Sequence, residues 1–280
     1  MADVQAVLEQ SLQLGDEGRW EEMAQMLAAA LVDDPDDAYL LCWAGVAERE
    51  LGNDGVAYDL FRRCIAQDPA DAHLLSLAGS GLAAFDDPEA ERVLRAAALT
   101  EPDSASTRTQ YGAYLARAGL FPEALEHLRA GVSLDPDDPI AHGELGVALA
   151  LKGDMTGAVD AMENALEIAP TDSWTRVLLG LVRLEEGDAI AAAETLLEAA
   201  RERADDGEAQ ILAALAAAAV GWADAAEEAI ARAEYGVEGS DVELLGVAGD
   251  AIAAGDVAAR KLLVEHLAPS VLHDRLTQPL

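Results

Sequence analysis

The sequence predicts an all-α fold built as a tandem array of helical hairpins, because three kinds of helix-boundary residue recur along it at one spacing. The first kind is an Asp or Ser of the type that caps a helix N-terminus, where its side-chain oxygen accepts hydrogen bonds from backbone N–H groups that lack a partner. Successive members are 34, 33, 34, 34, 34 and 34 residues apart. These expected caps are Asp37, Asp71, Ser104, Asp138, Asp172, Asp206 and Ser240.

Prolines and glycines follow the same spacing. A proline stands two residues before each of five caps and, because proline cannot continue a helix, it marks the end of the preceding helix. A glycine recurs in the middle of the units, where a turn is expected between two helices. Three boundary signals with one period identify a tandem repeat. An array of this kind presents an extended surface to other molecules. The prolines are Pro35, Pro69, Pro102, Pro136 and Pro170, and the glycines are Gly18, Gly52, Gly119, Gly153, Gly187, Gly221 and Gly255.

Each unit contains the same expected elements in the same order. A cap begins a first helix of about 14 residues, a glycine turn follows, and a second helix runs to the proline. In the unit over 138–170, Leu145 lies in the first helix and Gly153 makes the turn. Ala158 and Met162 recur four residues apart on one face of the second helix. The pattern predicts seven complete or nearly complete hairpins.

Some units depart from this pattern. The unit over 71–102 is one residue short and carries FDDPEA where the turn glycine is expected. In the unit from Asp172, Ala204 replaces the proline, and the unit from Asp206 is dominated by alanine. The last unit, from Ser240, is degenerate, and we expect it to cap the array.

This arrangement resembles the tetratricopeptide repeat (TPR) family, whose 34-residue signature reads W-x2-L-G-x2-Y, then A-x3-F, then P. The resemblance implies an all-α, right-handed superhelical solenoid of hairpins that binds other proteins. We expect the TPR array to cover residues 1–272. Residues 273–280 then form a C-terminal tail, and APSVLHDRLTQPL is either irregular or a single solvating helix. In the unit over 138–170 the matching positions are His142, Leu145, Gly146, Leu149, Ala158, Met162 and Pro170.

The chain is strongly acidic. Its 53 Asp and Glu residues against 18 Lys and Arg residues give a formal net charge of −35. Such a field repels the phosphates of nucleic acids and anionic lipids, so we expect neither as a partner. Two interpretations remain: the acidity adapts the surface to high salt, or it attracts a specific basic partner. The even spread of acidic residues over the repeats favours the first.

No targeting or membrane-spanning segment is visible in the sequence. The start, MADVQAVLEQ, lacks the basic region and apolar stretch of a signal peptide. No apolar run is long enough to span a bilayer, so we expect a cytoplasmic protein without membrane insertion. Cys42 and Cys64 are then expected to be buried thiols, with a disulfide between them as the alternative.

No catalytic or ligand-binding motif is recognisable. The five histidines are scattered among different units and form no HExxH motif, and no Gly-rich phosphate-binding motif occurs. The acidic run DDPDD at 33–37 lacks the spacing of an EF-hand loop and fits helix capping instead. Because the repeats occupy nearly the whole length, we expect no enzyme, no cofactor and no metal site.

The residues that could bind a partner lie on the first helices, which line the concave face in TPR proteins. Positions 2, 5, 9 and 12 after each cap share one face of a first helix. In the units from 138, 172 and 206 this face is largely apolar. An apolar stripe on an outward face indicates either a binding site or a surface that the protein itself covers. The candidate binding residues are Tyr39, Arg49, Ile140, Val147, Trp174, Val177, Leu181, Leu184, Ile211 and Leu215.

Two interpretations of the apolar stripe stay open. It is a docking groove for an amphipathic helix or an apolar peptide, or the protein buries it itself through a tight superhelix, a folded-back tail or a homodimer. On the first interpretation the protein is a non-enzymatic protein–protein interaction scaffold that binds an apolar or basic-apolar segment. The alternative function is an accessory or regulatory subunit of an enzyme or envelope-assembly complex, without a fixed peptide ligand.

Overall fold

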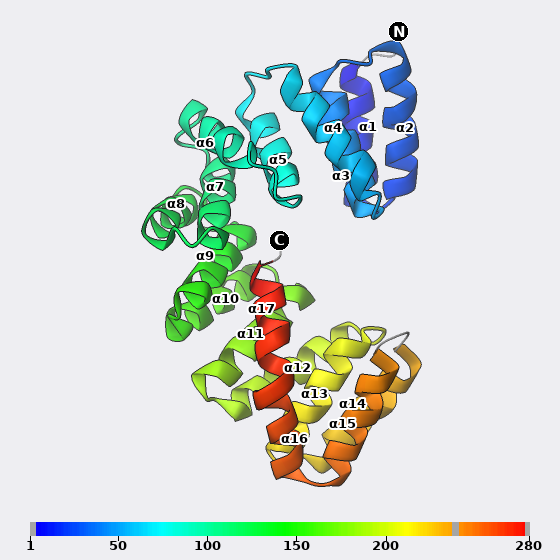
Figure 1. Ribbon diagram of the computed structural model, residues 1–280, viewed down its shortest axis with the longest axis vertical. Coiled ribbons are helices and arrows are strands. Elements are labelled where there is room, and N and C mark those ends of the chain that lie inside the picture. Colours follow the sequence, from blue (N-terminus) through cyan, green and yellow to red (C-terminus); the bar gives the residue numbers. More distant parts are fainter. Residues whose placement is uncertain (1–3, 237–240, 278–280) are drawn as a thin grey trace. The chain divides into compact units, whose positions relative to one another are not determined.

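The computed structural model describes residues 4–236 and 241–277, and all regular elements in these ranges are helices (Figure 1). The chain divides into two compact units, with the boundary inside one helix: unit 1 runs to Leu115 and unit 2 begins at Ala116. Within each unit, consecutive helices pair as hairpins, as the sequence predicts.

Unit 1 contains three hairpins and the start of a fourth. Within each of the three hairpins the two helices pack on each other, and α2 packs on α3 as α4 does on α5. The helices are α1 (Val4–Asp16), α2 (Trp20–Asp33), α3 (Ala38–Glu50), α4 (Asp54–Ala66), α5 (Ala72–Ala83), α6 (Ala90–Thr100) and α7 (Ala105–Arg117), which passes into unit 2.

Unit 2 continues the pattern through three further hairpins and a C-terminal segment. Its helices are α8 (Phe121–Leu134), α9 (Pro139–Lys152), α10 (Met155–Ile168), α11 (Ser173–Glu186), α12 (Ala189–Glu202), α13 (Gly207–Ala219) and α14 (Ala223–Gly236). The C-terminal segment contains α15 (Asp241–Ala253), α16 (Asp256–Leu262), a π-helical turn η1 (Leu263–Leu267) and α17 (Ala268–Thr277).

The expected caps begin the first helices. Five carboxylates accept hydrogen bonds from backbone N–H groups two or three residues ahead, for example Asp37 from Leu40 at 2.9 Å and Asp206 from Ala209 at 3.0 Å. Ser104 caps more weakly, because its hydroxyl lies 3.4 Å from the Thr107 nitrogen. The sequence prediction is confirmed at these six positions, and Ser240 lies outside the described residues. The five carboxylate caps are Asp37, Asp71, Asp138, Asp172 and Asp206.

The turns inside the hairpins are also those predicted. All seven expected turn glycines have a left-handed backbone, with φ between 69° and 105°. This region is strained for residues that carry a Cβ. The short unit over 71–102 closes its turn without glycine, because Asp86 itself takes a positive φ of 54°. The next residue, Asp87, is buried and accepts hydrogen bonds from the Glu89 backbone N–H at 2.7 Å and the Tyr58 hydroxyl at 2.8 Å.

The two helices of a hairpin approach closely at a glycine of the first helix. A Cβ on Gly45 would lie 2.8 Å from the Phe61 ring, and one on Gly180 would lie 2.6 Å from Leu196. The remaining interface consists largely of buried alanines and leucines. Small residues at these positions are therefore a packing requirement of the hairpin.

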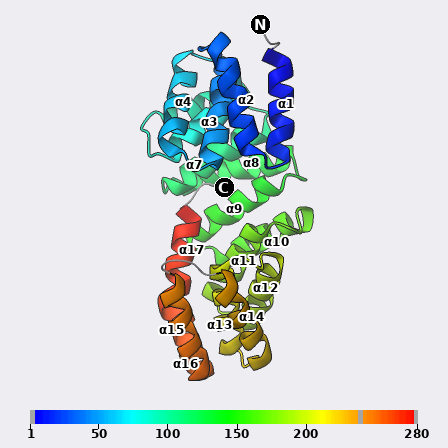
Figure 2. The ribbon, with the colours of Figure 1, turned by 90° about the vertical axis from the view of Figure 1, so that its right-hand side faces the viewer.

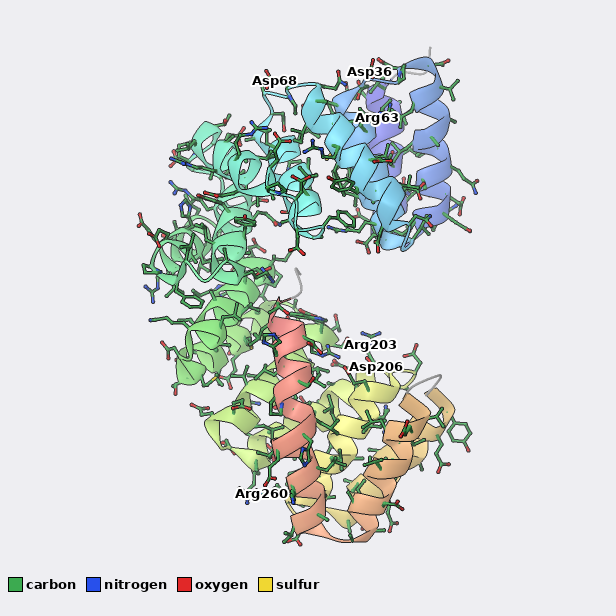
Figure 3. The ribbon with its side chains drawn as sticks, in the orientation of Figure 1. Asp36, Arg63, Asp68, Arg203, Asp206 and Arg260 are labelled. Atoms are coloured by element: carbon green, nitrogen blue, oxygen red, sulfur yellow. The ribbon has the colours of Figure 1, made fainter. Side chains whose placement is uncertain are left out.

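Side chains also fix the loops between hairpins. Arg63 reaches from α4 to the loop between α2 and α3, where its guanidinium donates to the Pro35 carbonyl at 2.5 Å (Figure 3). At the turn between α12 and α13, the Arg203 Nε lies 3.5 Å from the Asp206 carboxylate (Figure 3). The first contact ties a hairpin to the loop before it, and the second lies within a single loop.

The last hairpin of unit 2 does not stack like the others. In the preceding hairpins, the second helix of one packs extensively on the first helix of the next, as α12 does on α13. Here α15 makes little contact with α14, whereas α16 packs mainly on α13. The C-terminal segment therefore turns back over the first helices of unit 2.

Candidate binding face

We define the unit 2 face as the side of α9, α11 and α13 formed by positions 2, 5, 9 and 12 after each cap. The same spacing that predicts this face from the sequence brings its residues together on adjacent first helices. Eight of the ten candidate binding residues belong to it, and the other two lie on α3 in unit 1. The eight are Ile140, Val147, Trp174, Val177, Leu181, Leu184, Ile211 and Leu215.

The centre of the unit 2 face is buried. Trp174 and Leu184 are half-buried, and Ile140 at the edge is 53% exposed. The central side chains therefore do not form an open stripe, which is the outcome that the self-burial interpretation expects, and a segment of the same chain supplies part of their cover. The central side chains, all with at most 1% of their surface exposed, are Val147, Val177, Leu181, Ile211 and Leu215.

The cover is the C-terminal segment. α16 and η1 pack on α13, and α17 packs on α11 and α9. In Figures 1 and 2, α17 lies along the first helices of unit 2, and Figure 2 shows it on the opposite side from α10 and α12. The self-burial interpretation that invoked a folded-back tail therefore describes the observed arrangement. The predicted tail from residue 273 is the second half of α17 up to Thr277, and residues 278–280 lie outside the described residues.

One side of α17 carries its contacts with the face. Ala268, Leu272 and Leu276 recur every four residues, so they share one side of the helix, and all three are buried. Arg275, beside Leu276, donates to the Glu208 carboxylate of α13 at 2.5 Å. Glu208 stands at position 2 after its cap, so this ion pair places α17 on the predicted face.

The polar fit beneath the cover is incomplete. The Nε atom of Arg275 is buried without a hydrogen-bond partner. A buried polar group without a partner carries a desolvation cost of about 1–3 kcal/mol. The contact between α17 and the face is thus mainly apolar, with one ion pair that is only partly satisfied.

The sequence offers a folded-back tail as one possible cover of the stripe but does not single out the helix over 268–277. The signal was present, because LxxRL at 272–276 places two leucines and an arginine on one side of a short helix. What the sequence could not supply was the direction of the chain after α14, since this depends on packing across unit 2.

Unit 1 presents a more polar first-helix face. Tyr39 is 40% exposed, and its hydroxyl donates to the Asp71 carboxylate at 3.0 Å. That hydrogen bond raises the pKa of Tyr39. The capping bond from the Leu74 N–H lowers the pKa of Asp71, and the bond from Tyr39 adds to this effect. Arg49 is half-buried and pairs with Glu50 at 3.2 Å.

Other kinds of site find little support in the described part of the chain. Over residues 4–236 and 241–277 there is no cluster of three or more His, Cys, Asp or Glu side chains that could hold a metal ion. Across the same ranges, no helix has the length and apolar character needed to cross a membrane. Cys42 and Cys64 are both buried free thiols, so the thiol interpretation is confirmed and the disulfide alternative is not observed.

The periodic caps, turn glycines and close helix pairs match a known repeat. The family model of the tetratricopeptide repeat matches residues 8–72, 88–139 and 112–173. The chain belongs to the tetratricopeptide repeat family. TPR proteins are generally non-enzymatic scaffolds that bind protein or peptide partners. No curated protein sequence matches the chain.

Solved structures of TPR proteins share the fold of this chain. The APC/C hetero-tetramer Cut9-Hcn1 aligns with a TM-score of 0.67 at 20% identity, over 85% of this TPR chain and 48% of its own. PilW, a widely conserved type IV pilus biogenesis factor, aligns with a TM-score of 0.60 at 19% identity, over 72% and 94%. A thermophilic TPR protein of Thermus thermophilus aligns with a TM-score of 0.55 at 24% identity, over 64% and 98%.

Proposed function

We propose that this TPR protein is a non-enzymatic interaction scaffold that binds an apolar or basic-apolar segment of a partner protein on the unit 2 face. The observation that carries the proposal is the state of that face: an apolar track over three first helices, holding a helix with two buried leucines and an arginine paired to Glu208. A surface that accommodates one amphipathic helix has the shape and chemistry to accommodate another.

The acidity of the chain supports a basic-apolar partner over an acidic one. With a net charge of −35, the protein attracts cationic segments and repels anionic ones at a distance. Glu208 provides a carboxylate at the edge of the apolar track, where a basic side chain of the partner can pair with it.

The test is a capture experiment with a matched pair of tryptophan variants. The full chain is immobilised, captured proteins from the native host are identified, and the affinity of each purified partner is measured. Trp174→Ala removes the half-buried aromatic of the unit 2 face, and we expect it to weaken binding by about 30-fold, as loss of an anchor worth about 2 kcal/mol does.

Trp222→Ala is the matched control, because Trp222 is also half-buried but lies at the turn before α14, away from the face. Circular dichroism checks that both variants keep their helix content. Equal loss of affinity in the two variants would contradict a binding role for the face. A partner that resists competition by short peptides of its own sequence would support the alternative function of an accessory subunit.

A further inference from the structure

The C-terminal helix suggests what the partner looks like. We propose that α17 is a displaceable internal ligand of the unit 2 face, and that the external partner is an amphipathic helix with the same pattern. That pattern is two leucines four residues apart, with an arginine or lysine directly before the second. This inference rests on the proposed scaffold function and specifies the chemistry of its ligand.

The pattern follows from the contacts of α17. Leu272 and Leu276 are its large buried side chains, and Ala268 extends the same side by one turn. A small residue at that place keeps the helix close to the first helices beneath it. Arg275 adds a cation opposite Glu208, whose side chain keeps 39% of its surface exposed at the edge of the track. A partner helix needs these features and no others of the α17 sequence.

The polar side chains of α17 other than Arg275 face away from the track, and Val271 is half-buried. Ser270, His273, Asp274 and Thr277 are exposed, so the helix is polar on its outer side and apolar on its inner side. A helix of this kind binds to an apolar surface as a separate amphipathic element, through anchors spaced along one face. It is therefore chemically equivalent to a peptide ligand that happens to be joined to the chain.

Three observations indicate that the contact can open. Only three side chains of α17 are buried, whereas α12 buries six and α13 eleven residues. The buried Nε of Arg275 has no partner, so the internal fit is not fully satisfied. A π-helical turn, η1, precedes α17, and such irregular turns interrupt the helix where it can bend.

Displacement of α17 leaves the hairpins of unit 2 intact. The hairpins from α8 to α14 pack on one another through their own alanines, glycines and leucines. The part of the apolar track on α9 and α11 that α17 leaves behind becomes available to the partner, while α16 and η1 stay packed on α13. Internal and external helices therefore compete for one surface. The apparent dissociation constant of a ligand is then its intrinsic value divided by the fraction of chains in which α17 is undocked.

The experiment uses a fluorescent synthetic peptide of residues 264–277, VEHLAPSVLHDRLT, as the probe. The full chain carries either Leu272→Asp with Leu276→Asp, which undocks α17 and leaves the face unchanged, or His273→Asp with Thr277→Asp as the control. The control adds the same number of acidic residues to exposed positions of α17. Fluorescence anisotropy measures the affinity for the probe, and circular dichroism measures helix content.

We expect the undocked variant to bind the probe at least about tenfold more tightly than the wild type, and the control to match the wild type. A probe with Arg275→Glu or Leu272→Asp should lose this binding. Should the undocked variant lose helix content beyond α17, the single variant Arg275→Glu in the full chain replaces it, with an expected gain of about threefold. No gain in a folded variant would overturn the proposal.

Two further results separate this proposal from others. If light scattering shows a wild-type dimer that the two leucine substitutions dissociate, the occupant of the face is a second copy and the proposal is wrong. If a captured partner binds the wild type and the undocked variant equally, the scaffold function stands and the internal-ligand proposal fails. The scaffold function fails by a different result, equal binding losses in Trp174→Ala and Trp222→Ala.

Discussion

At the scale of single residues, the fourth position after a cap has a role that the TPR signature does not suggest. The signature places tryptophan there. In four units of this chain the position holds a polar donor that bonds to a carbonyl of the preceding loop. The pairs are Arg108 with Pro102 at 2.9 Å, His142 with Pro136 at 3.0 Å, Arg176 with Pro170, and Gln210 with Arg203 at 3.4 Å.

These donors satisfy carbonyls of the loops that follow the preceding helices. We expect Arg176→Met to destabilise unit 2 by about 1–3 kcal/mol, because it removes the bond to Pro170 and the ion pairs with Glu198 and Glu202. The Arg176 side chain is only 13% exposed, so water replaces these partners poorly. Urea unfolding of the full chain measures the change.

Arg201→Met is the matched control for this prediction, because Arg201 is exposed on α12. We expect it to change stability by less than about 0.5 kcal/mol. Equal effects from the two substitutions would show that loss of positive charge, and not the loop contact, determines the result.

Asp87 makes the turn of the short unit sensitive to acid. The hydrogen bond from the Glu89 backbone, with those from Tyr58 and Arg62, holds the pKa of Asp87 below its usual value. A carboxylate with a lowered folded-state pKa stabilises the fold above its unfolded pKa of about 3.9, and this contribution is lost as the pH falls. Asp87→Asn should therefore unfold more easily than wild type at pH 7, and the difference should shrink below about pH 4.

The comparison for this prediction is Asp59→Asn, an exposed carboxylate on the neighbouring α4. Chemical unfolding at a series of pH values, followed by circular dichroism, gives the stability difference for each variant. A difference for Asp87→Asn that stays constant down to about pH 3 would mean that the side chain acts through its shape and not through its charge.

At the scale of elements, the α3–α4 hairpin shows which glycines serve packing. Gly45→Ala would place a Cβ 2.8 Å from the Phe61 ring, so we expect a loss of about 1–3 kcal/mol as the ring shifts. Gly55→Ala in the same hairpin meets no atom within 4 Å, and we expect no loss and a gain of up to about 1 kcal/mol. Thermal melts of the two variants test this, and similar losses at both glycines would contradict the packing explanation.

The elements also show how far the sequence predicts this structure. Caps, prolines and turn glycines act on their own few residues, so local chemistry was enough to place the helix boundaries. The sequence shows that the turn at Asp86 and Asp87 lacks the glycine. It does not show what stabilises the turn instead, because the partner Tyr58 lies in the preceding hairpin. The position of α17 depends on contacts with α9, α11 and α13, and 67 residues separate the ion-paired Glu208 and Arg275. Spacing grouped the residues of the unit 2 face on the first helices, but tertiary packing determines whether that face is covered.

At the scale of the whole molecule, acidity is a property of both units. The carboxylates have structural uses as caps and ion-pair partners, but 53 acidic against 18 basic residues leave most of the negative charge uncompensated. Like charges on a folded surface repel one another more than they do in an expanded chain, so this excess opposes folding when salt is scarce.

Salt should therefore stabilise the protein. Raising KCl from about 0.05 to 1 M shortens the screening length from more than about 10 Å to about 3 Å, which weakens repulsion between carboxylates on neighbouring helices. We expect the melting temperature to rise by at least about 5 °C over this range, which corresponds to a gain of roughly one to two kcal/mol for a chain of this size. Sucrose at equal osmolality is the control, since it strengthens burial without screening charge. A melting temperature that is flat or falls with KCl would rule out adaptation to salt, and attraction of a basic partner would then be the better explanation of the acidic surface.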